Sequence, residues 1–164
     1  TVGELQLRGG ALMMGFYKVD PSKVFTSDGF YGTNDLVRME EDGNLYFVAR
    51  RGDMLKTAGA NVSRLEVQAA FATLPEVDLP IVLGLPDPES GQIVVAGIVP
   101  KPGTSPTEDY FKAELRKTLS SYKVPKHVLI IDADEVLWTP SNKVKLNEMA
   151  DVFAAKIRAL EATS

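Results

Sequence analysis

Apolar and polar residues alternate over GELQLRGG near the start of the chain, and the stretch ends in two glycines. This period of two predicts a strand closed by a turn. Two β-prone runs, Leu36 to Met39 and Leu45 to Ala49, are joined by Glu-Glu-Asp-Gly-Asn, a pattern typical of a hairpin in which Gly43 supplies a positive φ. The hairpin places Asp35, before its first strand, and Arg50, after its second, at the same end.

The next segment, RRGDMLKTAGANV, has little regular pattern. It leads into SRLEVQAAFATL, in which Ser63 and Glu66 have the spacing of a capping box. In such a box the serine oxygen accepts from a backbone N–H of the first turn and the glutamate reaches back. We therefore predict a helix over about residues 64 to 74. Its predicted inner face is formed by Leu65, Ala69, Ala70 and Leu74.

The second half of the chain alternates between strands and helices. PIVLGLPD and QIVVAGIVPK are typical of two buried strands separated by turn residues. A helix over about 107–121, a strand over 127–131 and a final helix from near Val144 should follow. The final helix has an apolar stripe of Met149, Val152, Phe153, Ile157 and Leu160. This order predicts an α+β fold, with a sheet of roughly three strands flanked by helices.

Composition narrows the possible functions. The 164 residues are 45% hydrophobic and 24% charged, which is enough apolar material for a globular core. A net charge of -4 provides no field that would gather phosphate backbones, so nucleic acid is not an expected partner. The chain has no cysteine, and its single histidine, His127, adjoins the apolar run VLII. We therefore expect no metal site in this chain and a structural role for His127 at a strand edge.

No apolar run approaches the roughly 20 residues of a membrane helix, and the N-terminal residues have no signal-peptide pattern. Together with the absence of cysteine, this favours a cytoplasmic protein without a transmembrane segment. The chain opens without methionine in an apparent strand, so we expect a fragment.

Four motifs, in order GFYGTNDL, ARRGDMLKTAGANVSRLEVQ, LSSYKVPKHV and TPSNKVK, resemble the C-terminal part of the adenylate-forming superfamily. This superfamily includes acyl-CoA synthetases, peptide-synthetase adenylation domains and beetle luciferases. GELQLRGGALMMGFYK looks like an earlier segment of the same region. The resemblance implies that residues 1–51 are the β-rich end of a large N-terminal domain and that residues 52–164 are the small mobile C-terminal domain.

The resemblance assigns nucleotide contacts to Asp35 and Arg50. Asp35 matches the aspartate that holds the two ribose hydroxyls of ATP, which suits a carboxylate because it accepts two hydrogen bonds at once. Arg50 matches an arginine that contacts the same nucleotide. A turn cap is the alternative role for Asp35, and a solvated charge is the alternative for Arg50. Gly52 stands at the position of the hinge, where the family usually has an aspartate or lysine. Glycine would make rotation of the small domain easy, but it has no charged side chain to hold either end state.

Lys56 and Gly59 match residues of the second half-reaction. Lys56 corresponds to a lysine that faces the active site in relatives that make thioesters, and a surface lysine is the alternative. Gly59, within GANV and the residues around it, resembles the strand and loop that line the pantetheine tunnel, where a missing side chain lets the thiol pass. A plain turn glycine is the alternative for Gly59.

Lys143, in TPSNKVK, matches the lysine that enters the active site during adenylation. A carboxylate must attack an α-phosphate there, so a mobile cation is needed where negative charge develops. A solvated lysine before a helix is the alternative. The family often has glycine where Asn34 and Asn142 stand, and asparagine tolerates the left-handed backbone that such turns need.

The resemblance thus implies the C-terminal part of an acyl-CoA synthetase, an acid–thiol ligase that forms AMP, acting on a carboxylic acid, expected to be a fatty acid. ATP and CoA would be its co-substrates. Mg²⁺ ligands and the phosphate loop would lie in the N-terminal large domain, so this chain alone should be inactive. A docking module without catalysis, loading of a carrier-protein thiol, and a generic α/β binding domain are the alternatives.

Overall fold

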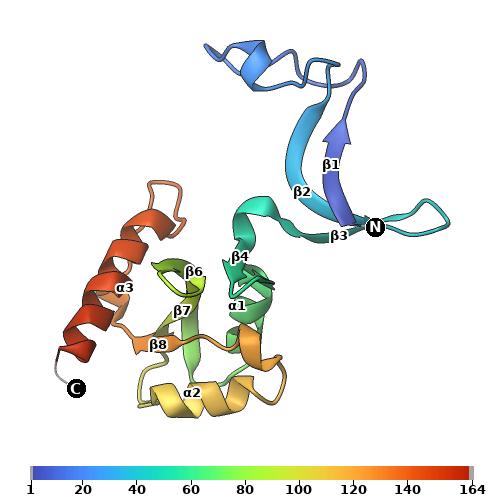
Figure 1. Ribbon diagram of the computed structural model, residues 1–164. Helices are drawn as coiled ribbons and strands as arrows, with labels where there is room; N and C mark the ends of the chain where they lie inside the picture. The colour runs from blue at the N-terminus through green and yellow to red at the C-terminus, as the bar shows by residue number, and fades with distance from the viewer. Residues whose placement is uncertain (1, 163–164) are drawn as a thin grey trace. The chain divides into compact units, whose positions relative to one another are not determined.

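The structure is a computed structural model that describes residues 2–162, and it divides into two compact units, residues 1–54 and 55–164. Each unit is described by itself (Figure 1). The sequence predicted a boundary after residue 51. The short helical turn η2 (Arg51–Asp53) belongs to the first unit, and the predicted domain boundary stays a prediction.

The first unit contains one antiparallel sheet in the order β1-β2-β3. Its strands are β1 (Val2–Leu7), β2 (Tyr31–Met39) and β3 (Leu45–Arg50), and η1 (Pro21–Lys23) lies in the long connection between β1 and β2. The predicted hairpin between β2 and β3 is confirmed, with Gly43 at φ 82° and the Glu40 N–H donating to the Asn44 carbonyl at 3.1 Å. β2 begins at Tyr31 rather than at Leu36, so Asp35 lies inside the strand.

The division between the units falls after the first residue of β4 (Met54–Thr57), and β4 forms a two-stranded sheet with β5 (Ala60–Ser63). The intervening residues Ala58 and Gly59 both have positive φ, 48° and 79°. Two such residues in succession form the tight turn whose twist suits a hairpin. Sequence patterning missed this hairpin because strands of four residues are too short to display alternation.

A three-stranded sheet of β6 (Val77–Asp87), β7 (Gly91–Pro100) and β8 (His127–Ile130) forms the centre of the second unit. β6 and β7 are antiparallel, and β7 and β8 are parallel. The helices are α1 (Arg64–Ala72), α2 (Glu108–Leu115) and α3 (Leu146–Glu161), with 3-10 turns η3 (Ser121–Lys123) and η4 (Ala133–Glu135). This confirms the predicted α+β class with helices flanking a sheet of three strands.

Both faces of this sheet are covered, which explains the nearly continuous apolar runs of β6 and β7. On one face Val82, Ala96 and Ile98 pack with Phe71 of α1 and Phe111 of α2. On the other face a second core surrounds α3 and contains Ile81, Leu83, Val95, Leu129, Met149, Phe153 and Ile157. α1 and α3 accordingly lie on opposite sides of the sheet (Figure 1). Successive strand residues contribute to alternate cores, as the pleat requires.

The inner face predicted for the first helix is partly wrong. Val67 and Phe71, four residues apart, are the buried positions of α1, whereas Leu65 is 41% exposed and Ala69 is also exposed. Ala70 and Leu74 pack against the core as expected. The Ser63 cap is confirmed, because its Oγ accepts from the Glu66 N–H at 3.3 Å. The Glu66 carboxylate pairs with Lys123 Nζ at 2.6 Å, so it holds η3 beside α1.

The other helices are shorter than predicted. α2 ends at Leu115 rather than near residue 121, and α3 begins at Leu146 rather than at Val144. In the predicted stripe of α3, Met149, Phe153 and Ile157 are buried, but Leu160 is 54% exposed. Within residues 2–162 no helix is both long enough and apolar enough to cross a membrane.

Candidate active site

A β-bulge in β2 shapes the first part of the site. Glu4 of β1 pairs with Leu36, but Gln6 pairs with Gly32, so three residues of β2 stand opposite the single residue Leu5. Asn34, the middle of these three residues, has φ 61°. The predicted left-handed backbone at Asn34 is confirmed. A bulge of this kind redirects side chains beside a functional site.

The bulge is held by the hydroxyl of Thr33. Its Oγ1 donates to the Leu5 carbonyl at 2.9 Å and accepts from the Asp35 N–H at 3.1 Å. The first hydrogen bond fastens the extra residues of β2 to β1, and the second lies within β2. They also fix where the backbone places Asp35.

Asp35 and Arg50 lie opposite each other in the register of β2 and β3, and Arg50 Nε donates to Asp35 Oδ1 at 2.9 Å. The Asp35 side chain is 27% exposed and that of Arg50 is 65% exposed. The hydrogen bond and charge of Asp35 raise the pKa of Arg50 above its ordinary value. The predicted placement of both residues at one end of the hairpin is therefore confirmed, and they form one charged unit.

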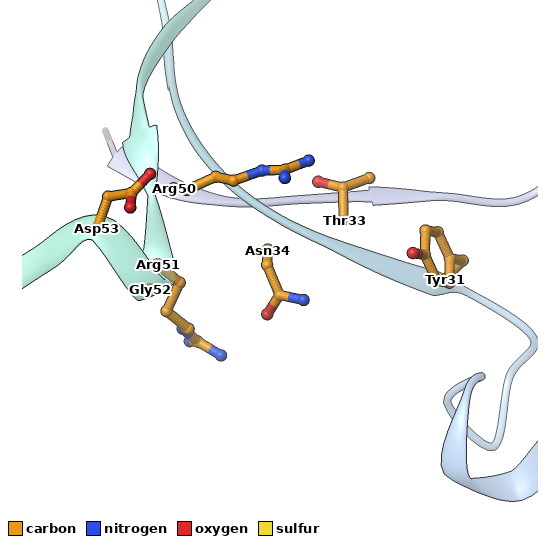
Figure 2. A pocket seen from close by; sticks show the side chains of 7 residues that line it. All are labelled: Tyr31, Thr33, Asn34, Arg50, Arg51, Gly52 and Asp53. Carbon is orange, nitrogen blue, oxygen red and sulfur yellow. The ribbon is translucent and has the colours of Figure 1, made fainter. Parts of the chain in front are cut away.

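An open cleft of about 610 Å³ lies beside this ion pair within the first unit. Its lining comes from two segments, β2 and the stretch that joins the end of β3 to η2 (Figure 2). The lining residues are Tyr31, Thr33, Asn34, Arg50, Arg51, Gly52 and Asp53. The cleft thus offers the Tyr31 side chain, a hydroxyl, an amide, one carboxylate and two guanidinium groups, and the excess of cationic groups suits a polar, anionic ligand.

Gly52, the predicted hinge, lies in the 3-10 turn η2. A Cβ added at Gly52 would meet open space, and Gly52 is not among the glycines with positive φ. Neither packing nor backbone angle therefore demands glycine in this conformation. Its role as a hinge stays a prediction.

Lys56 and Gly59 lie in the hairpin of β4 and β5. Lys56 is exposed, and its backbone N–H donates to Gln92 Oε1 at 3.2 Å. The Ala58 N–H donates to the Ser90 carbonyl at 3.0 Å, which ties the turn before Gly59 to the β6–β7 connection. A Cβ on Gly59 would meet no atom within 4 Å, so glycine serves its positive φ of 79° here. The roles of Lys56 and Gly59 in the second half-reaction stay predictions.

Lys143 is exposed on a narrow loop that precedes α3. The Thr139 N–H donates to the Lys143 carbonyl at 2.7 Å, and the Lys143 N–H donates to Thr139 Oγ1 at 3.1 Å. A β-bridge between Trp138 and Val144 continues this pairing. Asn142 in the loop has φ 58°, as expected from its place in the motif. The loop backbone is thus fixed while the Lys143 ammonium extends into solvent.

The elements that carry Lys56 and Lys143 pack on opposite faces of the β6–β8 sheet. Leu55 and Val62, from the hairpin of Lys56, belong to the core of α1 and α2. Val144, which follows Lys143, packs against the core of α3.

His127 lies at the start of β8, where it pairs with Val95 in register. Burial lowers the pKa of His127 below its ordinary value, and the nearby carboxylate of Glu108 opposes that shift. This agrees with the structural position at a strand end that the sequence predicted. Among residues 2–162 no group of three or more His, Asp or Glu side chains could hold a metal ion.

Sequence reasoning did not identify the residues that support the site: Glu4, Thr33 and Thr139. Glu4 and Thr33 make hydrogen bonds between β1 and β2 that depend on how the two strands pair, and Thr139 makes one that closes the loop of Lys143. For Thr33 and Thr139 a signal was present, because each hydroxyl residue precedes an asparagine that adopts a left-handed backbone. Glu4 gave no such signal.

Comparison with known proteins agrees with the resemblance seen in the motifs. Residues 66–143 match the family model of the AMP-binding enzyme C-terminal domain. The oxalate–CoA ligase of Arabidopsis thaliana is 33% identical over 94% of this chain, and a salicylyl-CoA synthase / salicylate adenylyltransferase of a Streptomyces species is 31% identical over 98%. The chain spans only about 30% of the length of these relatives (30% and 29%).

Solved structures give the same result. The crystal structure of ATP-bound MatB from Rhodopseudomonas palustris matches 93% of this chain with a TM-score of 0.77 and 26% identity, over 30% of its own length. The amide bond synthetase McbA from Marinactinospora thermotolerans matches 93% with a TM-score of 0.75 and 29% identity, over 31% of its length.

Proposed function

This chain belongs to the adenylate-forming superfamily of AMP-binding enzymes, and we propose from this premise that it is the C-terminal part of an ATP-dependent acid–CoA ligase. The whole enzyme would convert a carboxylic acid, ATP and CoA into acyl-CoA, AMP and pyrophosphate. The observation that supports this proposal best is the joint occurrence of the Asp35–Arg50 ion pair beside a polar cleft and Lys143 on a fixed loop.

In the first step a carboxylate oxygen attacks the α-phosphorus of ATP, and pyrophosphate leaves. We propose that Asp35 accepts hydrogen bonds from the ribose hydroxyls and that Arg50, already oriented by Asp35, donates to the nucleotide. Lys143 would contact the carboxylate and the phosphate region, where negative charge increases in the transition state. Its exposed position on a closed loop suits delivery into a site built by another part of the protein.

In the second step the thiol sulfur of CoA attacks the acyl carbonyl carbon, and AMP leaves. We propose that rotation about Gly52 withdraws Lys143 and presents Lys56 together with the turn at Gly59. The opposite packing of the two lysine-bearing segments supports such an alternation, because each step would need a different face of the second unit.

The partner for these faces would be a large N-terminal domain, which would also carry the phosphate loop and the Mg²⁺ ligands. Two observations support this. The relatives are about three times as long as this chain, which spans 30% of the first. The first unit also exposes many large apolar side chains, among them Met14 (96%), Tyr17 (88%) and Phe47 (61%), as an interface would.

The acid itself follows from neither the sequence nor the fold. A fatty acid remains our prediction, whereas the named relatives include an oxalate–CoA ligase and a salicylyl-CoA synthase. CoA is the acceptor we propose, but the resemblance to an amide bond synthetase makes the acceptor worth testing directly. A cytoplasmic location is part of the same proposal.

The test is acid-dependent exchange of pyrophosphate into ATP, measured for the full-length protein and for this chain alone with short, medium, long and aromatic acids. Exchange by the full-length protein only, followed by thioester formation with CoA, is the expected result. Exchange by this chain alone would contradict the assignment of the phosphate site to another domain. Absence of exchange in both would reject the ligase in favour of a docking module.

A further inference from the structure

The carboxylate of Glu4 contacts both walls of the cleft. Its Oε1 accepts from the backbone N–H of Asn34 at 3.2 Å, and its Oε2 pairs with Arg51 at 3.1 Å. Asn34 belongs to the wall formed by β2, and Arg51 belongs to the wall that leads into η2. One side chain on β1 thus joins two segments that are 17 positions apart (51 − 34) in the sequence.

The surroundings of Glu4 are shaped to receive this carboxylate. Its side chain is only 18% exposed, compared with 65% for Arg51. A Cβ placed on Gly32 would lie 2.9 Å from Glu4 Oε1, so the absence of a side chain at Gly32 gives the carboxylate its place. Gly32 is also the residue at which the register of β1 and β2 resumes on one side of the bulge.

The hydrogen bond from Asn34 to Glu4 matters because of where Asn34 lies in the bulge. Asn34 has a left-handed backbone within the bulge, and it has no partner in the register of β1 and β2. An ionised carboxylate is a stronger acceptor for such an N–H than a neutral group. The hydrogen bond therefore stabilises the bulge that also places Asp35 against Arg50.

We propose that Glu4 is a positioning residue for the nucleotide site, which sets the separation of the cleft walls and fixes the start of the segment leading to the second unit. This proposal rests on the proposed function for the identity of the ligand. Glu4 itself does not line the cleft, so it would act through Asn34 and Arg51. Its loss should weaken nucleotide binding and leave chemistry in the bound state largely intact.

Three variants separate the two contacts. Glu4→Ala removes both contacts, and Glu4→Gln keeps an acceptor for Asn34 but removes the charge that holds Arg51. Arg51→Met removes the ion pair and leaves the Asn34 contact, but it also removes a guanidinium from the cleft lining. The matched control is Glu40→Gln, which breaks an ion pair with Arg38 (2.7 Å) in the same sheet but outside the cleft. Each variant is made in the 164-residue chain and in the full-length protein.

The first readout, amide hydrogen exchange of Asn34 in the 164-residue chain, does not depend on the proposed function. Glu4→Ala should accelerate this exchange about tenfold, the equivalent of one typical hydrogen bond, while the Glu40 control leaves it unchanged. Unchanged exchange in Glu4→Ala would overturn the proposal, whatever the enzyme does.

The second readout is the KM for ATP of the full-length protein. We expect an increase of about tenfold for Glu4→Ala and of about threefold for Glu4→Gln, with kcat nearly constant. Arg51→Met should raise KM by at least as much as Glu4→Gln, because Arg51 also lines the cleft. The double variant of Glu4→Gln and Arg51→Met should be no worse than Arg51→Met alone, because both changes remove the same ion pair. A fall in kcat with an unchanged KM would overturn the positioning role. A wild-type protein that binds no ATP would reject the proposed function, and the exchange measurement would still decide whether Glu4 holds the bulge.

Discussion

Asp35 and Arg50 are cross-strand partners on β2 and β3, joined by a hydrogen bond of 2.9 Å between Arg50 Nε and Asp35 Oδ1. The guanidinium is planar and rigid, so the hydrogen bond through Nε also orients the remaining N–H donors of Arg50. The pair therefore combines an acceptor with several donors, and Arg50 of this pair lines the cleft. A ribose with a nearby phosphate needs this combination.

The first prediction concerns Asp35→Asn in the full-length protein. The amide keeps the size of the side chain but loses the charge that binds Arg50 and, in our proposal, the ribose. We expect the KM for ATP to rise about tenfold or more, as for the loss of hydrogen bonds to a charged group. Asp42→Asn, in the turn between β2 and β3, is the matched control and should leave KM unchanged. An unchanged KM in Asp35→Asn would remove the ribose from our account of this residue.

A second prediction tests the hydroxyl of Thr139, which accepts from the Lys143 N–H at 3.1 Å. Thr139→Val keeps the shape of the side chain but frees the loop, so adenylation should slow about tenfold while thioester formation from supplied acyl-AMP is unaffected. Thr139→Ser should restore the rate.

The control for Thr139 is Thr104→Val. The Thr104 hydroxyl also closes a turn, by donating to the Lys101 carbonyl at 2.7 Å, but in a different loop of the same unit. Equal slowing of both half-reactions in Thr139→Val would indicate general loss of stability rather than loss of loop geometry.

A third prediction concerns packing across the sheet of the second unit. A Cβ on Gly97 of β7 would overlap the ring of the fully buried Phe153 of α3. Gly97→Ala should therefore lower the free energy of unfolding by about 1 to 3 kcal/mol, the usual cost of overpacking a core. Urea unfolding of the 164-residue chain measures this change. Gly52→Ala, whose added Cβ meets open space, should unfold like the wild type.

The fourth prediction is a pH dependence of stability. The pKa of His127 is lowered in the folded state by burial, so the unfolded state, with an ordinary pKa of about 6.5, takes up the proton first. The contribution of neutral His127 to stability is thus complete above about pH 6.5 and is lost as the pH falls through the folded-state pKa.

Urea unfolding between pH 7.5 and 5.5, followed by the fluorescence of Trp138, should show this decline. His127→Gln should flatten the curve within that window. A decline of equal slope in the variant would assign the effect to other groups.

The sequence predicted the sheet of the second unit because β6 and β7 are long, apolar and bounded by turn residues. It also predicted the meeting of Asp35 and Arg50, because a hairpin determines its own register. It did not predict the hairpin of β4 and β5, whose stability comes from contacts such as Leu55 with the core and Ala58 with Ser90. These partners are distant in the chain, so no local pattern reveals them.

The helix faces illustrate the same limit. Leu65 and Val67 are both apolar residues of α1, and period alone did not decide which of them faces inward. The ring of Phe71, which contacts Phe111 of α2 edge to face with centroids 5.7 Å apart, determines the rotation of α1 and buries Val67. The contact of Glu4 with Arg51 was equally invisible, because it depends on a bulge that strand patterns do not show.

The most direct test of the central claim is the rate of both half-reactions in the full-length protein carrying Lys143→Ala, beside Lys145→Ala as a control two residues away. Lys145 is paired with Glu148 at 3.0 Å, so its removal tests a charge of the same sign at the start of α3. We predict that Lys143→Ala slows adenylation by about a hundredfold or more, the equivalent of about 3 kcal/mol for one preorganised charge-stabilising group, and leaves thioester formation from acyl-AMP unchanged. Adenylation at the wild-type rate in Lys143→Ala would contradict the account.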